Sequence, residues 1–192
     1  MNSEHSMSAH FKRQLADYVE YHRDPRNCAL HIFGIIFLFL AAVLPLSLWP
    51  VHAFGVQISI AAILVLPALL YWLLLDFGIG IAIVGAAFLL LATAGMIVNY
   101  ASVAAVWTVT AVLIVIGVSF QIIGHRVFER RQPALVDNPS HLLLGPMFVM
   151  AKLYIALGLR NDLAAIIVPS PQPAIRSASA LSDHLSKSLP HT

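Results

Sequence analysis

Apolar residues run almost without interruption through the middle of the chain, and charged residues are confined to its two flanks. Between Cys28 and Gly124 the sequence carries one formal charge, Asp76, and no lysine or arginine. A membrane-spanning helix needs about 20 predominantly apolar residues, so this block is long enough for four such helices. The pattern predicts an all-α, polytopic membrane bundle with four transmembrane helices.

Proline, glycine and polar residues divide the apolar block at three places. The breaks fall at Trp49-Pro50, at Asp76 with the glycines that follow it, and at Asn99-Tyr100. Neighbouring helices in a bundle tolerate a proline inside a membrane helix, so isolated prolines elsewhere in the block do not count as breaks. The predicted membrane helices are Cys28–Trp49, Ala53–Leu75, Phe77–Val98 and Ala101–Gly124.

The two flanks have their own patterns. Before the block, apolar residues at helical spacing predict an amphipathic helix over Phe11–His22, and Asn27 is placed to cap the first membrane helix. After the block, Leu142–Leu159 is apolar but contains Lys152, which would cost roughly 2.5–3.5 kcal/mol at mid-membrane. This run is therefore predicted to be an interfacial helix. The predicted divisions are 1–27, 28–124, 125–160 and a disordered tail over 161–192.

Composition and charge agree with a membrane protein and exclude other classes. Of the 192 residues 59% are hydrophobic and 10% are charged, whereas a soluble domain carries about 25% charged residues. A net charge of +2 gives no indication of nucleic-acid binding. The single cysteine, Cys28, excludes an internal disulfide and any multi-cysteine metal site.

The distribution of basic residues predicts the topology. The short loops inside the block have no lysine or arginine, so the positive-inside rule places both flanks in the cytoplasm and requires an even number of spans. A multi-pass protein of a bacterial inner membrane is favoured, or of the endoplasmic reticulum if the chain is eukaryotic. The basic residues of the flanks are Lys12, Arg13, Arg23, Arg26, Arg126, Arg130 and Arg131.

This topology places several chemically capable side chains in one layer at the cytoplasmic face. His22 precedes the first membrane helix, His31 lies about one turn inside it, and His125 follows the fourth. If that helix continues, Glu129 lies on the same face as His125. Asp76 falls in the same layer. Three imidazoles favour Fe, Zn, Cu or Ni over Mg or Ca, so the sequence predicts a metal site with Asp76 as a further candidate ligand.

Less specific interpretations remain open for each of these residues. His31 could bond to a neighbouring helix, His125 and Glu129 could form an interfacial polar pair, and Asp76 could be a solvated loop residue. His141, in an Asn-Pro-Ser-His turn, is a weaker candidate. The sequence lacks a zincin H-E-x-x-H helix, a P-loop, a G-x-S-x-G elbow and the clustered histidine boxes of membrane desaturases.

Two sequence motifs resemble the Mpo-like family of membrane 2-hydroxy fatty acid dioxygenases, over roughly residues 10–158. The first motif, near the N-terminus, is Tyr21-His22-x4-Asn27-x3-His31-x2-Gly34. The second, after the last predicted span, is Gln121-x2-Gly124-His125-x2-Phe128-Glu129-x3-Pro133-Ala134-Leu135. The two motifs are specific in combination, whereas either alone would be weak.

The resemblance implies an Fe(II)-dependent dioxygenase that uses O2 to shorten a 2-hydroxy fatty acid by one carbon in α-oxidation. It implies that His22, His31 and His125 associate with iron, with Glu129 in the matching motif. On this reading Glu129 is a ligand or an orienting group, and Arg126 or a neighbouring arginine pairs with the substrate carboxylate. The implied partners are the fatty acid and membrane lipid. The chain departs from the family pattern at Lys152, where the family carries an acidic residue.

Two other functions are compatible with the sequence. The first is a non-catalytic membrane scaffold or lipid-binding protein in which the histidines are structural. The second is a haem-binding electron carrier with His31 and His125 as axial ligands on facing helices. The paired motifs rank the dioxygenase first, the scaffold second and the haem protein third.

Overall fold

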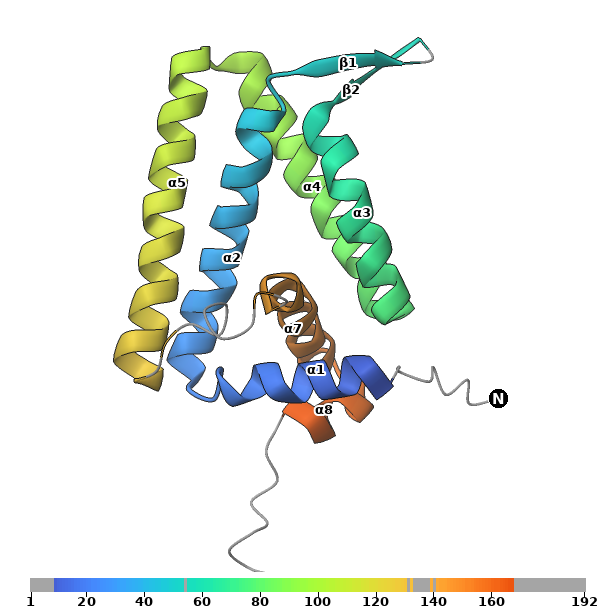
Figure 1. Cartoon of the computed structure of the whole chain (residues 1–192), viewed down its shortest axis with the longest axis vertical. Helices are drawn as coiled ribbons and strands as arrows, with labels where there is room; N and C mark the ends of the chain where they lie inside the picture. Colours follow the sequence, from blue (N-terminus) through green and yellow to red (C-terminus); the bar gives the residue numbers. More distant parts are fainter. Residues whose placement is uncertain (1–8, 54, 131, 133–138, 140, 168–192) are drawn as a thin grey trace, which may run out of the picture.

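The computed structural model describes residues 9–53, 55–130, 132, 139 and 141–167, and it consists mainly of apolar helices in two pairs. Helix α2 (Pro25–Leu46) packs along α5 (Val103–Ile123), and α3 (Ile60–Leu75) packs along α4 (Phe77–Tyr100). The two pairs lie together at one end, beside a β-hairpin, and diverge toward the other end (Figure 1).

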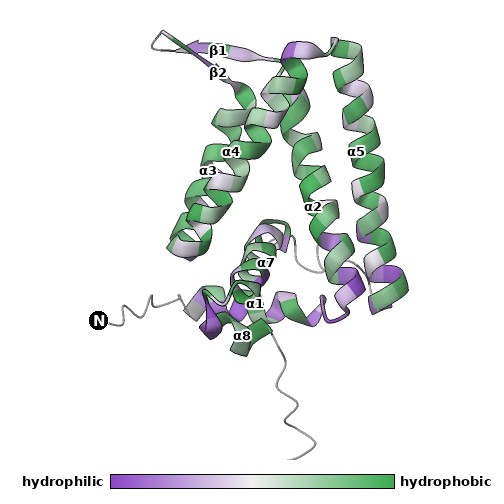
Figure 2. Ribbon diagram, turned by 180° about the vertical axis from the view of Figure 1, so that it is seen from behind, coloured by the Kyte–Doolittle hydropathy of each residue, from purple (hydrophilic) through white to green (hydrophobic). Residues whose placement is uncertain are grey.

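Within the described residues, three segments are long and apolar enough to cross a membrane: α2, α4, and α5 with its continuation to Glu129. Figure 2 shows hydrophobic residues along the length of these helices, with hydrophilic residues gathered at α1 and at the adjoining ends of α2 and α5. The predicted class, a helical membrane bundle, is confirmed. Helix α3 has 16 residues, fewer than the roughly 20 that a perpendicular span needs, so the count of four spans stays a prediction.

The prediction that a helix begins at Ala53 is wrong. Strands β1 (Pro50–Ala53) and β2 (Val56–Ser59) form an antiparallel hairpin, and α3 begins only at Ile60. The turn residue Gly55 has a φ of 76°, a conformation that glycine adopts without steric cost. Branched residues on both strands favour the extended backbone, although their hydropathy resembles that of a membrane helix.

The helix boundaries around the N-terminal motif also differ from expectation. Helix α1 covers Ala9–Glu20, and α2 begins at Pro25 with Asp24 as its N-cap, whose side chain accepts a hydrogen bond from the Arg26 N–H. Asn27 therefore does not cap the helix, because Pro25 at the first helical position and Asp24 before it already satisfy the preferences of this end. This difference leaves the Asn27 side chain free to contact another segment.

The chain after α5 closes the open end of the bundle. Helix α5 continues into a π-helical segment, η1 (Gly124–Glu129), a form that occurs often at functional sites. Helix α7 (His141–Ala156) enters between the diverging helix pairs, with α1 and α8 (Asn161–Ile167) beneath it (Figure 1). The disordered tail predicted from residue 161 is wrong for α8, and residues 168–192 lie outside the described part of the chain.

One hydrophobic core joins these elements at the open end. Its members come from α1, α2, α3, α4, α7 and α8, so the amphipathic N-terminal helix is part of the folded bundle. Burial of this cluster fixes α7 relative to both helix pairs. The largest fully buried side chains in the cluster are Phe11, Leu15, Tyr18, Ile79, Leu144, Met147, Phe148 and Leu163.

Candidate metal centre

Three histidines from separate segments meet at the open end of the bundle. His22 lies in the connection between α1 and α2, His31 near the start of α2, and His125 in η1. One side-chain nitrogen from each lies within 4.8 Å of the other two. The ring centroids are 4.3 Å apart for His22 and His31, 4.9 Å for His22 and His125, and 5.6 Å for His31 and His125.

Small residues let α2 and the end of α5 approach closely enough to bring these rings together. A Cβ added at Gly34 of α2 would lie 2.7 Å from Nε2 of Gln121, whose side chain donates a hydrogen bond to the His31 carbonyl at 3.3 Å. A Cβ at Gly124 would collide with Oδ1 of Asn27. The glycines of both sequence motifs therefore have a packing role.

Glu129, at the far end of η1, stabilises the same contact between the start of α2 and the end of α5. Its Oε1 accepts hydrogen bonds from the Asp24 N–H at 2.7 Å and from the Asn27 amide at 3.2 Å. The Asn27 amide also donates to the Tyr21 carbonyl at 3.2 Å. These bonds tie η1, which carries His125, to the segment between His22 and His31. Glu129 is not part of the three-histidine group, and its contacts are with the backbone and side chain of the neighbouring segment.

The hydrogen bonds of the imidazoles leave one buried nitrogen of each ring without a hydrogen-bond partner among the described residues. Nδ1 of His22 donates to the Tyr18 carbonyl at 2.9 Å, so Nε2 is the nitrogen that carries the lone pair. Among the described residues, His22 Nε2, His31 Nδ1 and His125 Nδ1 are buried and have no hydrogen-bond partner. Buried polar atoms are normally paired, and a metal ion satisfies three such nitrogens at once. The donor set therefore fits a resident transition metal.

Tyr18 supports two of the three histidines. Its ring stacks on His22 with centroids 4.2 Å apart and planes 9° apart, and its hydroxyl lies 2.5 Å from Nε2 of His31. Burial raises the pKa of the Tyr18 hydroxyl well above its ordinary value, so the group stays protonated. Tyr18 lies within the predicted amphipathic helix Phe11–His22, for which the sequence analysis proposed no functional role. Its position four residues before His22 was the signal that could have identified it.

Burial keeps His22 in the neutral form that binds metal. The pKa of His22 is lowered from 6.5 to about 2, mainly because burial penalises the charged ring and secondly because His31 lies beside it. A neutral imidazole does not have to release a proton before it coordinates a metal. His22 therefore remains competent as a ligand at any pH at which the fold is stable.

The same pKa shift predicts how the metal-free protein responds to acid. The unfolded chain takes up a proton on His22 near pH 6.5, whereas the folded chain does not until about pH 2, so stability is lost as pH falls below 6.5. His22 contributes a loss of up to about 1.4 kcal/mol per pH unit over this window. Denaturant unfolding of wild type and His22→Phe between pH 7.5 and 5 measures it. Equal pH slopes for the two proteins would contradict the assignment.

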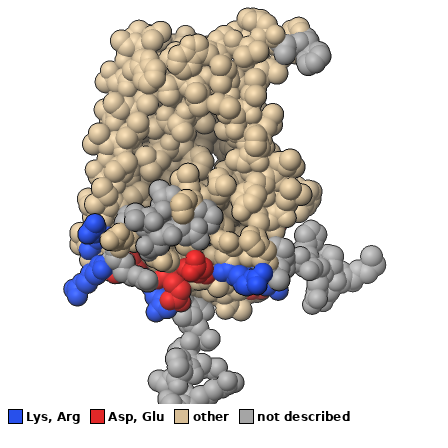
Figure 3. Space-filling model, in the orientation of Figure 1, with Lys and Arg blue, Asp and Glu red and all other residues tan. Residues whose placement is uncertain are grey.

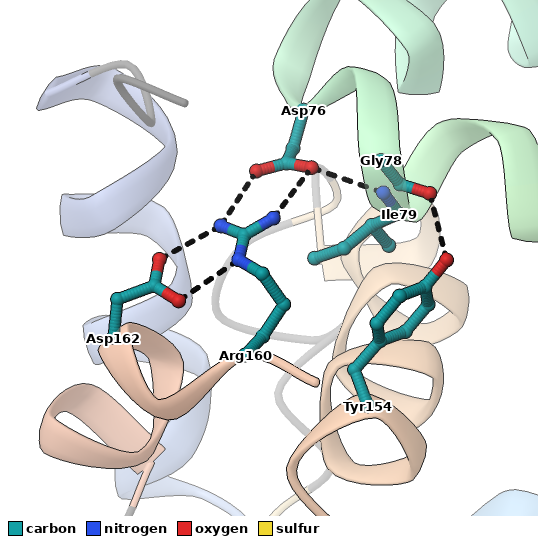
Figure 4. Close-up of polar contacts among 6 residues, drawn as sticks. All are labelled: Asp76, Gly78, Ile79, Tyr154, Arg160 and Asp162. Carbon is teal, nitrogen blue, oxygen red and sulfur yellow. Dashed lines mark hydrogen bonds and ion pairs between the residues drawn. The ribbon is translucent and has the colours of Figure 1, made fainter. Parts of the chain in front are cut away.

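Asp76 does not join the histidines, which corrects its prediction as a ligand. Its carboxylate caps α4 by accepting from the Ile79 N–H at 3.0 Å and pairs with both terminal nitrogens of Arg160, at 3.1 and 3.2 Å (Figure 4). Arg160 also bonds Asp162, and the Tyr154 hydroxyl donates to the Gly78 carbonyl at 3.0 Å. Asp76 therefore anchors the α3–α4 turn to the segment after α7.

The remaining candidates lie around the site rather than within it. The Arg126 and Arg130 side chains are exposed, and Arg131 lies outside the described residues. His141 is buried and pairs through Nε2 with Asp17 at 2.9 Å. It contacts the Tyr18 ring at a centroid distance of 5.4 Å, so this weaker candidate belongs to the surroundings of the site.

Lys152 is also accounted for by local packing. Its ammonium lies 3.1 Å from the Cys28 sulfur and 5.1 Å from the centroid of the Phe148 ring. Phe148 in turn packs against His22, with centroids 5.3 Å apart. The lysine is partly buried, and Phe148 lies between it and the histidine cluster. Figure 3 shows where the charged side chains on one face of the bundle gather.

Comparisons with known proteins match most of the chain. A family model described as 2-hydroxy-palmitic acid dioxygenase Mpo1-like matches residues 8–157. The chain is 32% identical over 160 residues to the protein named 2-hydroxy-palmitic acid dioxygenase MPO1 from Saccharomyces cerevisiae, covering 81% of this chain and 86% of the yeast protein. No solved structure matches the chain.

Proposed function

Because the chain belongs to the family of proteins like 2-hydroxy-palmitic acid dioxygenase Mpo1, we propose that it is an Fe(II)-dependent dioxygenase of 2-hydroxy fatty acids. In the proposed reaction one O2 oxidises the hydroxyl-bearing carbon to a new carboxyl group, and the original carboxyl carbon leaves as CO2 with formation of one water. The product is the fatty acid one carbon shorter.

The observation that carries this proposal is the group of three histidines. Each offers a ring nitrogen within 4.8 Å of the other two, and each has a buried ring nitrogen without a hydrogen-bond partner among the described residues. His22, His31 and His125 would hold the iron, which when bound supplies the ability to activate O2. The protein residues contribute fixed donor positions. The Tyr18 carbonyl sets the tautomer of His22, and Glu129 fixes η1 against the start of α2. Burial keeps bulk water away from the ligands.

We place the site at the cytoplasmic face, with both termini cytoplasmic and the bacterial inner membrane as the favoured location. The support is the distribution of charge: on the face drawn in Figure 3 the Lys, Arg, Asp and Glu side chains gather at the end that carries α1 and α8. The histidine cluster lies at this end. A polar headgroup region is where the carboxylate of a fatty acid also lies, so site and substrate would meet there.

The proposed role of Arg126 or Arg130 in pairing with the substrate carboxylate stays a prediction. Both side chains are exposed, and both lie in or directly after η1, the segment that carries His125. An exposed guanidinium near the headgroups could pair with a carboxylate before the substrate enters the site.

The direct test combines metal analysis with an oxygen-dependent assay. Protein purified in detergent and loaded anaerobically with Fe(II) should retain about one iron per chain after desalting. It should then consume 2-hydroxypalmitate only when O2 is admitted, with release of CO2 and the acid one carbon shorter. Stable loading without O2-dependent loss of substrate would contradict the dioxygenase and leave a metal-binding scaffold.

The haem alternative is not favoured by the geometry. The His31 and His125 ring centroids are 5.6 Å apart, and His22 lies against both rings. A third imidazole packed against both proposed axial ligands suits a small ion better than a planar macrocycle. The scaffold alternative predicts that alanine at each of the three positions leaves cellular function unchanged.

Glu129 provides a prediction that separates an orienting role from ligation. Glu129→Gln keeps an oxygen that can accept from Asp24 and Asn27, so we expect its metal affinity to remain within about threefold of wild type. Glu129→Ala removes the brace, and we expect it to lower metal affinity by roughly 10–100-fold, the usual effect of losing an orienting partner. Isothermal titration with Fe(II), or Co(II) as an air-stable probe, measures both. Equal losses in the two variants would indicate that the carboxylate charge itself is required.

A further inference from the structure

An apolar cavity opens beside the candidate metal centre. It has a volume of about 120 Å³. Its polar lining comes from Tyr18, His31, Gln121, His125 and His141, and its apolar lining from residues of α2 and α7. A single water occupies roughly 10–15 Å³ on this measure, so the space holds a chain of several carbon atoms. We call it the inner cavity.

A second apolar cavity of about 160 Å³ lies farther along the same helices. It is lined by residues of α2, α3, α4 and α7, among them Trp72, Ala87 and Pro146, and by no charged side chain. We call it the outer cavity. It lies in the gap where the two helix pairs diverge, and Figure 3 shows a hollow in the uncharged surface of the bundle.

The two cavities share a wall. Ile35 and Phe39 line both, and the adjacent residues Gly145 and Pro146 of α7 line the inner and the outer cavity respectively. His31, Ile35 and Phe39 are spaced four residues apart, so they follow one face of α2 away from the metal centre. Over these eight residues the helix rises about 12 Å, so this face extends from the ligands to the outer cavity.

We infer that the inner and outer cavities form one acyl-chain channel, in which Ile35 and Phe39 set how far a fatty acid reaches past the metal centre. This inference rests on the proposed function. The carboxylate and hydroxyl would lie at the polar end beside His31 and Gln121, and the chain would pass Phe39 toward Trp72. An unbranched alkyl chain is the occupant that suits a narrow apolar passage that begins at a polar site and runs into the lipid-facing part of the bundle.

Close packing at Gly145 supports the inference that the position of the Ile35 side chain determines whether the two cavities connect. A Cβ at Gly145 would lie 2.7 Å from Cδ1 of Ile35 and 3.3 Å from the Tyr18 hydroxyl, so a side chain there would force Ile35, which lines both cavities, to shift. The absence of a side chain at this position of α7 leaves the space between the two cavities available. The passage thus depends on one glycine and two side chains of α2.

Chain-length selectivity tests the channel through kinetics. Ala87→Phe fills the outer cavity, so we expect kcat/KM for 2-hydroxypalmitate to fall about tenfold, because several carbons lose their apolar contacts. The value for 2-hydroxyoctanoate, whose chain ends near the metal centre, should change less than twofold. Ala92→Phe is the matched control, since Ala92 is exposed on the same helix, and it should leave both substrates unaffected. Equal losses for both substrates in Ala87→Phe, or none, would overturn the channel.

A binding measurement tests the channel without turnover. Trp72 lines the outer cavity and is 3% exposed, whereas Trp49 and Trp107 are each 49% exposed. In a protein with Trp49→Phe and Trp107→Phe, 2-hydroxypalmitate brominated in the distal half of its chain should quench Trp72 fluorescence. The same acid brominated near the carboxyl group should not, and unbrominated 2-hydroxypalmitate should relieve the quenching.

The two measurements separate failure of the channel from failure of the proposed function. Position-dependent, competable quenching in a protein without O2-dependent turnover would support an acyl channel and contradict the dioxygenase. Turnover with quenching that does not depend on bromine position would retain the dioxygenase and overturn the channel. Quenching by brominated phospholipid that 2-hydroxypalmitate does not displace would assign the outer cavity to membrane lipid, which also overturns the proposal.

Discussion

Replacing His125 with alanine should abolish tight metal binding and lower dioxygenase activity at least 100-fold. His125 is one of three histidines that each offer a ring nitrogen within 4.8 Å of the other two, and the variant leaves two imidazoles from neighbouring segments. Two ligands hold a divalent ion far more weakly than three, and each decade of affinity corresponds to about 1.4 kcal/mol. Metal content after desalting and O2-dependent loss of 2-hydroxypalmitate are the two readouts.

The matched control for this prediction is His52→Ala. His52 is an exposed residue of the β-hairpin, at the end of the bundle opposite the histidine cluster, so its removal should change neither readout. His125→Gln provides a second check, because it retains a polar group of similar size and should help the fold without restoring the metal. Wild-type metal content in His125→Ala would show that the ion is bound elsewhere and would contradict the candidate centre.

The three histidines could be predicted from the sequence because membrane topology assigns each residue near a helix end to one of the two membrane faces. Once the apolar block was divided into four segments, His22, His31 and His125 fell in one shallow layer, and few helices were available to separate them. The orientation of each ring could not be predicted in the same way. It depends on the local contact of Tyr18 with His22, four residues away, and on Glu129 and glycines 34 and 124, whose contacts join segments about 90–100 residues apart.

Asp76 shows where the layer argument fails. The carboxylate does lie at the charged end of the bundle. Its membrane face, however, does not determine its distance from the histidines or which other side chains bind it. Arg160, 84 residues later, pairs with it through two nitrogens. The same carboxylate also caps α4 by accepting a hydrogen bond from the Ile79 N–H. A cation beyond the last predicted helix could not be assigned to Asp76 from spacing alone.

The β-hairpin was not predicted from the sequence, for a different reason. Hydropathy separates apolar from polar segments, but Val51, Val56 and Ile58 are apolar in a strand as in a helix. Short apolar runs are ambiguous between the two structures, and only the turn at Gly55 marks the reversal. The missed hairpin shortens the second apolar helix to 16 residues, which is why the structure does not fix the number of spans.

Replacing Arg160 with methionine should destabilise the fold by about 3 kcal/mol, the largest effect we expect from a residue outside the metal centre. The Asp76 side chain is 3% exposed, and without Arg160 its charge stays buried, with the Ile79 N–H as its remaining hydrogen-bond donor in the described part of the chain. The cost of an unpaired buried charge exceeds that of losing the salt bridge itself. Equilibrium unfolding in detergent micelles measures the change. Arg13→Met, at an exposed position, should alter stability by less than about 0.5 kcal/mol.

A double variant tells whether the buried charge is the cause. Asp76→Asn with Arg160→Met removes both charges, and the asparagine oxygen still caps α4 at the Ile79 N–H, so most of the lost stability should return. If the double variant is no more stable than Arg160→Met, the arginine acts through its bond to Asp162 or through packing instead. Recovery would establish that Arg160 stabilises the fold by neutralising the buried Asp76 carboxylate. The contacts of Arg160 and Tyr154 join the end of α7 and the segment after it to the α3–α4 turn (Figure 4). Since α7 also lines both cavities, the same charge match would then support the walls of the acyl channel.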